Sequence, residues 1–124
     1  MLYNHSLNDK NMEKISNSLL NEEYYRYTLE NGLTVYLVPK TKFHRVYGVF
    51  ATKFGSCDCE FIPSGKTEFE RVPLGVAHFL EHKTFELEDE IDASDIFANF
   101  GAESNAYTTY DKTAYMFKAT STIK

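Results

Sequence analysis

The sequence predicts an α+β fold, an antiparallel sheet with helices packed on one face, in the order β-β-β-α-α-β-β. Strand-like segments rich in Val, Tyr and Phe stand on both sides of a helical central stretch, and an Asn-Gly pair joins two of them. Separate runs of strands and helices are typical of this layered arrangement. The 124 residues suffice for one domain at most.

The N-terminal residues, 1–21, are expected to form a polar arm ahead of the domain, which occupies 22–124. They are rich in Asn, Ser and Lys. Met12, Ile15 and Leu19 recur at helical spacing, so this stretch is predicted to be a short helix or a flexible arm.

Three strands should follow, over residues 24–29, 33–38 and 45–54. Asn31 and Gly32 form a strong signal for a two-residue hairpin turn between the first two. Gly48 lies inside the third strand, where a glycine often marks a close approach to the backbone.

The remaining elements are expected as a loop over 55–71, helices over 73–87 and 91–100, and strands over 103–109 and 113–119, with a tight turn between these strands. Pro73 suits the first turn of a helix, because its missing N–H costs nothing there. Gly101 is a stop signal for the second helix. In that helix Ile91, Ile96 and Phe100 are available to face inward.

Composition excludes several classes of protein. Lys plus Arg number 13 and Asp plus Glu 18, a net charge of −5 without a basic run, which argues against a nucleic-acid partner. No apolar stretch is long enough for a membrane span, and no apolar core follows a basic start as in a secretory signal. Two cysteines are too few for a disulfide scaffold. A soluble, cytoplasmic protein is expected.

The central helix carries the sequence His78-Phe79-Leu80-Glu81-His82, an H-x-x-E-H pattern. Successive residues of a helix advance by about 100° and about 1.5 Å, so His78 and His82 stand one turn apart on one face, with Glu81 on the same side. Two imidazoles that converge beside a carboxylate predict a catalytic zinc site, and H-x-x-E-H is the inverzincin signature. The alternative is a surface helix with three polar residues that serve solubility.

Several ordered motifs resemble one family. They are Gly75 to His82, Phe85, and Gly101 to Thr108, with Glu30 to Val35 near the start. Together they resemble the insulinase–pitrilysin group of inverzincin metallopeptidases, over about residues 24–119. The resemblance implies a zinc metalloendopeptidase in which His78 and His82 bind Zn²⁺. Glu81 would be the general base, taking a proton from a zinc-activated water and passing it to the leaving amine.

A predicted strand contains Asn105, Ala106 and Tyr107. From the residues alone it is an ordinary strand in which Tyr107 packs. The resemblance implies that a peptide or unfolded polypeptide substrate adds here as an extra strand. It also implies that Phe85 and Tyr107 line the pocket beside the scissile bond, although Phe85 by itself would suit the core.

The third zinc ligand of the family is a glutamate on a later helix, beyond Lys124. We therefore expect an N-terminal fragment that alone binds zinc weakly and cleaves nothing, and whose partner is the missing C-terminal half or a homologous subunit. The family's usual Gly-Thr after the motif is replaced by Glu86-Leu87-Glu88, which leaves the local loop geometry open.

Two alternatives remain. The chain could be a non-catalytic relative that serves as a structural or peptide-binding subunit. Cys57 and Cys59 could instead join His78 and His82 in a closed structural zinc site, because residues i and i+2 of a strand share a face. The eighteen residues between Cys59 and His78 do not fit the usual spacing of a zinc finger.

The other two histidines, His5 and His44, have no partner at ligand spacing and are expected at the surface.

Overall fold

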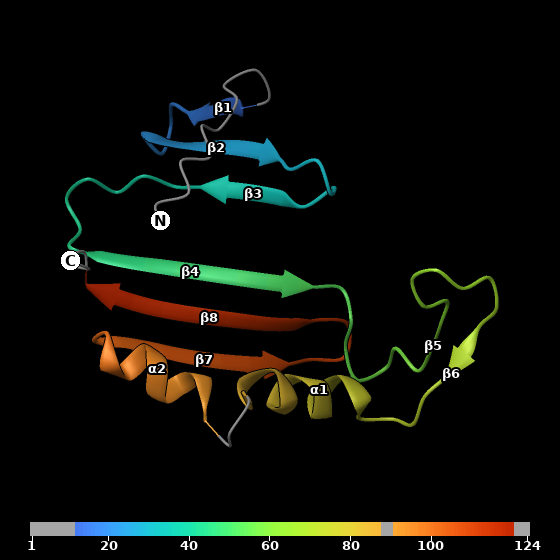
Figure 1. The fold of residues 1–124 in the computed structure, drawn as a ribbon. Coiled ribbons are helices and arrows are strands. Elements are labelled where there is room, and N and C mark those ends of the chain that lie inside the picture. Colours follow the sequence, from blue (N-terminus) through green and yellow to red (C-terminus); the bar gives the residue numbers. More distant parts are fainter. Residues whose placement is uncertain (1–11, 88–90, 121–124) are drawn as a thin grey trace. The chain divides into compact units, whose positions relative to one another are not determined.

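The computed structural model describes residues 12–87 and 91–120 (Figure 1). The chain divides into two compact units, Met1–Phe43 and His44–Lys124. The structure confirms the predicted α+β class with antiparallel strands and two helices. No helix within the described ranges is both long and apolar enough to cross a membrane.

The first unit holds a three-stranded antiparallel sheet in the order β1-β2-β3. Its strands are β1 (Met12–Asn17), β2 (Glu22–Thr28) and β3 (Thr34–Leu37). The helix or flexible arm expected around Met12, Ile15 and Leu19 is therefore wrong over β1. The segment is too short to be stable as an isolated helix, whereas β2 supplies its backbone with hydrogen bonds. Ion pairs also join Lys14 to Glu23 at 2.6 Å and Glu13 to Arg26 at 2.5 Å across the two strands.

The hairpin between β2 and β3 turns at the expected Asn-Gly pair, but its loop has three residues and not two. The N–H of Gly32 donates to the carbonyl of Leu29 at 2.9 Å, and the N–H of Leu29 donates to the carbonyl of Leu33 at 2.8 Å. Gly32 has a φ of 86°. A turn closed by a glycine in the left-handed region is the usual three-residue hairpin loop.

The second unit contains a three-stranded antiparallel sheet in the order β4-β8-β7 and a short ribbon, β5 with β6. The strands are β4 (Arg45–Thr52), β5 (Glu60–Phe61), β6 (Glu70–Arg71), β7 (Ala102–Thr108) and β8 (Thr113–Thr120), and the helices are α1 (Val76–Phe85) and α2 (Ala93–Asn99). The ribbon lies inside the predicted loop over 55–71. The described strands thus form two sheets and a ribbon, and not the single predicted sheet.

Both helices pack against one face of the second sheet (Figure 1). Phe85 of α1 lies against Tyr115 of β8 with ring centroids 6.1 Å apart, and Phe97 of α2 stacks on Phe117 of β8 at 6.0 Å. Gly48 makes the expected close contact, because a Cβ there would lie 2.2 Å from the Phe117 ring. The predicted packing of helices on one sheet face is confirmed.

The helix boundaries differ from the prediction. Gly75, with a φ of 88°, precedes the first residue of α1, so Pro73 lies ahead of the helix and not in its first turn. Helix α2 begins after Asp92, whose carboxylate accepts the N–H of Ser94 at 2.7 Å. Gly101 ends α2 as predicted, with a φ of 70°.

The inward face of α2 is not the predicted one. Ile91, Ile96 and Phe100 are 46%, 39% and 72% exposed. Phe97 and Ala93 instead line a cavity of about 880 Å³ between the two helices and the sheet. Because each residue turns the helix by about 100°, the face that meets the sheet depends on how the helix docks, which spacing alone does not fix.

Candidate metal centre

Helix α1 brings His78 and His82 together as predicted. Their Nε2 atoms are 3.0 Å apart, and their rings lie 4.9 Å apart at 23°. Two nitrogens bound to one tetrahedral zinc at about 2.0–2.1 Å would be about 3.3 Å apart. Both side chains are exposed, so the facing nitrogens are open to a ligand. The pair therefore fits two ligand positions of a zinc site with little adjustment.

Glu81 lies on the same helix and is half-buried. Its Oε2 accepts a hydrogen bond from the Oγ1 of Thr108 on β7. Helix α1 also meets β8, where the hydroxyls of Thr84 and Tyr115 lie 3.3 Å apart. These contacts fix the side of α1 that carries Glu81 against the sheet. Thr108 is the last residue of the second motif quoted for the family resemblance, but no pattern in the sequence assigns it a role.

No third metal ligand joins the histidine pair within the described residues, which contain no group of three or more His, Cys, Asp and Glu placed to hold a metal. Glu86 pairs with Lys83, and Glu103 pairs with Lys118 at 3.3 Å. Further acidic residues, at 88 and 90, lie outside the described ranges.

The alternative Cys₂His₂ site is contradicted by the same geometry. Cys57 and Cys59 are free thiols, and they form no metal-holding group with His78 or His82, all four being described. The cysteines follow β4 in a loop that contacts the β7–β8 turn. The two cysteines are therefore structural residues of this loop and not zinc ligands beside the histidines.

The predicted substrate strand is β7, which lies at an edge of its sheet because the order is β4-β8-β7. Ala106 pairs with Tyr115, whose side chain faces the helices. Since side chains alternate along a strand, Ala106 faces the helices, whereas Asn105 and Tyr107 face the opposite side. Tyr107 is 44% exposed.

Phe85 and Tyr107 therefore lie on different faces of the sheet. Phe85 lines the cavity between the helices and the sheet and packs on Tyr115. The described residues thus place Phe85 in apolar packing, as its residue type alone suggested. They do not bring the two aromatic rings into one pocket.

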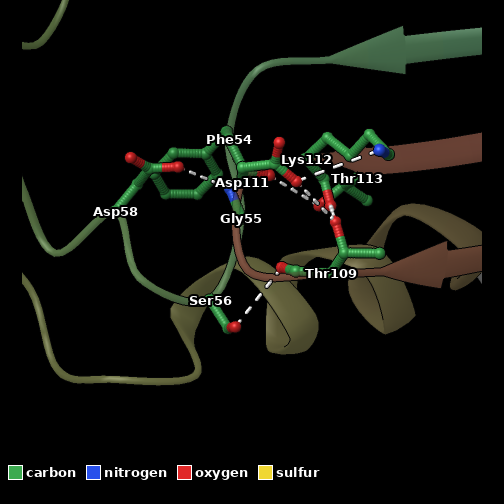
Figure 2. A network of polar contacts seen from close by, with 8 residues as sticks. All are labelled: Phe54, Gly55, Ser56, Asp58, Thr109, Asp111, Lys112 and Thr113. Carbon is green, nitrogen blue, oxygen red and sulfur yellow. Dashed lines mark hydrogen bonds and ion pairs between the residues drawn. The ribbon is translucent and has the colours of Figure 1, made fainter.

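A network of polar contacts holds the turn between β7 and β8 (Figure 2). The N–H of Ser56 donates to the carbonyl of Thr109 at 2.9 Å, and the N–H of Cys57 donates to that of Tyr110 at 3.0 Å. The hydroxyl of Thr113 donates to the carbonyl of Phe54 at 2.7 Å. The loop after β4 thereby fixes the end of the hairpin that carries Thr108.

Comparison with known proteins identifies the family. Residues 61–123 match the family described as Insulinase (Peptidase family M16). The match covers half of the chain, and this chain belongs to that family.

Individual relatives agree. The chain is 47% identical over 108 residues, 85% of its length, to the "Uncharacterized zinc protease YmfH" of Bacillus subtilis strain 168. It is 40% identical over 93 residues, 74% of its length, to the "Putative zinc protease AlbF" of the same strain. A crystal structure of a putative M16-like peptidase from Alicyclobacillus acidocaldarius matches 82% of the chain, with a TM-score of 0.73 and 44% identity. The chain spans 24%, 21% and 23% of the lengths of these three proteins.

Proposed function

We propose that this chain supplies two zinc ligands and the general base of a metalloendopeptidase that hydrolyses peptides. The observation that carries the proposal is the 3.0 Å separation of the His78 and His82 Nε2 atoms. Glu81 lies on the same helix, directly before His82. Membership of the insulinase family and relatives named zinc proteases support it. A catalytic zinc needs three protein ligands. The proposal places the third in another part of the polypeptide or in a partner subunit.

The two histidines and Glu81 are proposed to have different roles. Neutral imidazoles would hold the metal through the facing Nε2 atoms of His78 and His82. Bound zinc supplies Lewis acidity, which lowers the pKa of water and polarises a carbonyl. Glu81 takes the proton from the attacking water and delivers it to the amine that leaves. Its Oε2 accepts the hydrogen bond of the Thr108 hydroxyl, and we assign the proton transfer to Oε1, which has no hydrogen bond among the described residues.

The substrate is proposed to bind as a strand along the free edge of β7, at Asn105, Ala106 and Tyr107. Backbone hydrogen bonds to that edge would supply affinity without selecting a particular sequence, and side-chain pockets would supply preference. Phe85 is proposed to contribute to this preference through the cavity between the helices and the sheet, which its side chain lines. A peptide or unfolded polypeptide fits this mode, because its backbone must be extended and accessible.

The test is Glu81→Gln in the complete gene product. Glutamine keeps the shape of the side chain but cannot take a proton, so bound zinc should stay at the wild-type level while peptide cleavage is lost. Glu86→Gln is the matched control, because Glu86 lies at the end of the same helix, exposed and paired with Lys83. It should change neither quantity. Wild-type cleavage by the Glu81→Gln protein would refute the assigned base.

A second candidate is a non-catalytic member of the family that binds peptide or supports assembly. The position of β7 at an edge of its sheet, where an extended peptide can pair with it, is the observation that is compatible with this candidate. A complete gene product that binds extended peptides but neither retains zinc nor cleaves them would support this candidate over the peptidase.

A further inference from the structure

We infer that Thr108 is a positioning residue for Glu81, held in place by the pairing of its strand with β8. This inference rests on the proposed function, because it assigns Thr108 a role through the general base. The contact that supports it joins two elements far apart in the sequence: the Oγ1 of Thr108 on β7 donates to the Oε2 of Glu81 on α1. Thr108 is half-buried, as is Glu81, so this hydrogen bond is partly shielded from water.

The protons of the two hydroxyls decide the direction of the contacts. A threonine hydroxyl has a single proton to donate. Thr113 donates its proton to the Phe54 carbonyl at 2.7 Å, a normal length for this bond. Thr113 can then only accept from Thr108, whose oxygen is 3.4 Å away, beyond the usual range for two oxygens. The carboxylate is nearer and charged, so the Thr108 proton goes to Glu81.

The sheet fixes the frame of this contact. Thr113 is 2% exposed and stands in the central strand, paired with Thr52 of β4 on one side and Thr108 of β7 on the other. The three threonines form one row across the sheet, on the face that the helices cover. Figure 2 shows Thr113 at the Phe54 carbonyl, where β4 leads into the loop that holds the hairpin turn. Thr108 is thus held at the level of Glu81 by a rigid element.

The consequence for Glu81 is orientation. In solution the carboxylate of a glutamate rotates freely about the χ3 bond, because the distribution of this torsion angle is broad and roughly two-fold. A hydroxyl on Oε2 restricts that rotation and leaves Oε1 directed to one place. Thr108 touches neither substrate nor metal in this account, so it acts only through Glu81. Loss of the Thr108 hydroxyl should therefore lower kcat and have a smaller effect on the binding of substrate.

The experiment compares variants of the complete gene product, loaded with zinc. Thr108→Val keeps the shape but removes the hydroxyl, and we expect kcat to fall roughly 10- to 100-fold with KM and zinc content unchanged, as for a displaced catalytic group. Thr108→Ser restores a hydroxyl and should recover most of kcat. Thr109→Val is the matched control. Among the described residues, the acceptors near its single hydroxyl proton lie within the turn, at Asp111 (3.0 Å) and the Lys112 carbonyl (3.2 Å), so kcat should stay within about twofold, as for surface changes.

Failure of this inference is distinguishable from failure of the proposed function. If Glu81→Gln abolishes cleavage but Thr108→Val keeps wild-type kcat, the positioning role alone is refuted. If Glu81→Gln cleaves normally, the proposed function is refuted. Should Thr108→Val not fold, Thr108→Ala compared with Thr108→Ser repeats the test with a smaller side chain.

A spectroscopic readout makes the inference independent of turnover. The carboxylate ¹³C resonance of Glu81 can be assigned by its loss in Glu81→Gln. It should shift in Thr108→Val, return toward its position in Thr108→Ser, and stay in place in Thr109→Val. An unmoved resonance in Thr108→Val would overturn the contact itself.

Discussion

Gly55 is the position at which a single added methyl group should do most damage to the candidate site. It is buried, and a Cβ built on it would lie 2.5 Å from the backbone of Tyr110, Asp111 and Lys112. Its φ is not in the left-handed region, so the strain of Gly55→Ala is steric alone. Backbone cannot rotate aside as a side chain can, so the β7–β8 turn must move away from the loop after β4.

The cost of that movement can be worked from the contacts it breaks. Carbon atoms in contact are normally about 3.5–4.0 Å apart, so the turn must withdraw by about 1 Å. The hydrogen bonds from Ser56 and Cys57 to the turn carbonyls are 2.9 and 3.0 Å long and would be lost or stretched. Two such bonds at about 1 kcal/mol each, with about 1 kcal/mol of overpacking, give roughly 3 kcal/mol.

The assay is native-state amide hydrogen exchange on the complete gene product, read at β7 and β8. A loss of roughly 3 kcal/mol corresponds to about a hundredfold fall in protection of these strands if they open as one unit. Ser56→Ala is the control. It removes only a hydroxyl contact of 3.3 Å to the Thr109 carbonyl, while the Ser56 N–H keeps the same acceptor. Protection in Gly55→Ala within about threefold of wild type, under 1 kcal/mol, would refute the reasoning.

Two further predictions concern other parts of the second unit. Replacing both Cys57 and Cys59 with serine should leave zinc content, measured by elemental analysis, unchanged, because the structure keeps them apart from the histidines; a drop would revive the Cys₂His₂ site. The Ser94 N–H lowers the pKa of Asp92 below its ordinary 3.8, so the charged cap stabilises α2 above that pH and the benefit is lost as pH falls through the lower, folded-state pKa. Asp92→Ala should therefore reduce the amide protection of α2 at neutral pH, and the difference from wild type should disappear in acid. Asp92→Asn should keep most of the wild-type protection, because asparagine is also a good cap. A difference between Asp92→Ala and wild type that stays constant at all pH values would contradict the role of the charged cap.

The local features of the candidate site could be predicted from the sequence. The spacing of His78 and His82 fixes their mutual geometry as soon as the segment is helical, because one turn of a helix relates them whatever surrounds it. Gly101 ends α2 for a similarly local reason, since its left-handed φ favours glycine. The α+β class followed from the order of strand-like and helical segments.

Tertiary structure decided the features that depend on partners distant in the chain. The strand β1 exists because β2 offers it hydrogen bonds and opposite charges, which its own residue spacing does not reveal. The contact between Thr108 and Glu81 spans 27 positions and depends on where α1 docks on the sheet and on the register of β7. A one-residue slip of β7 would turn Thr108 to the other face. Helical spacing places the metal-binding nitrogens, but only packing and register bring a hydroxyl to the proposed base.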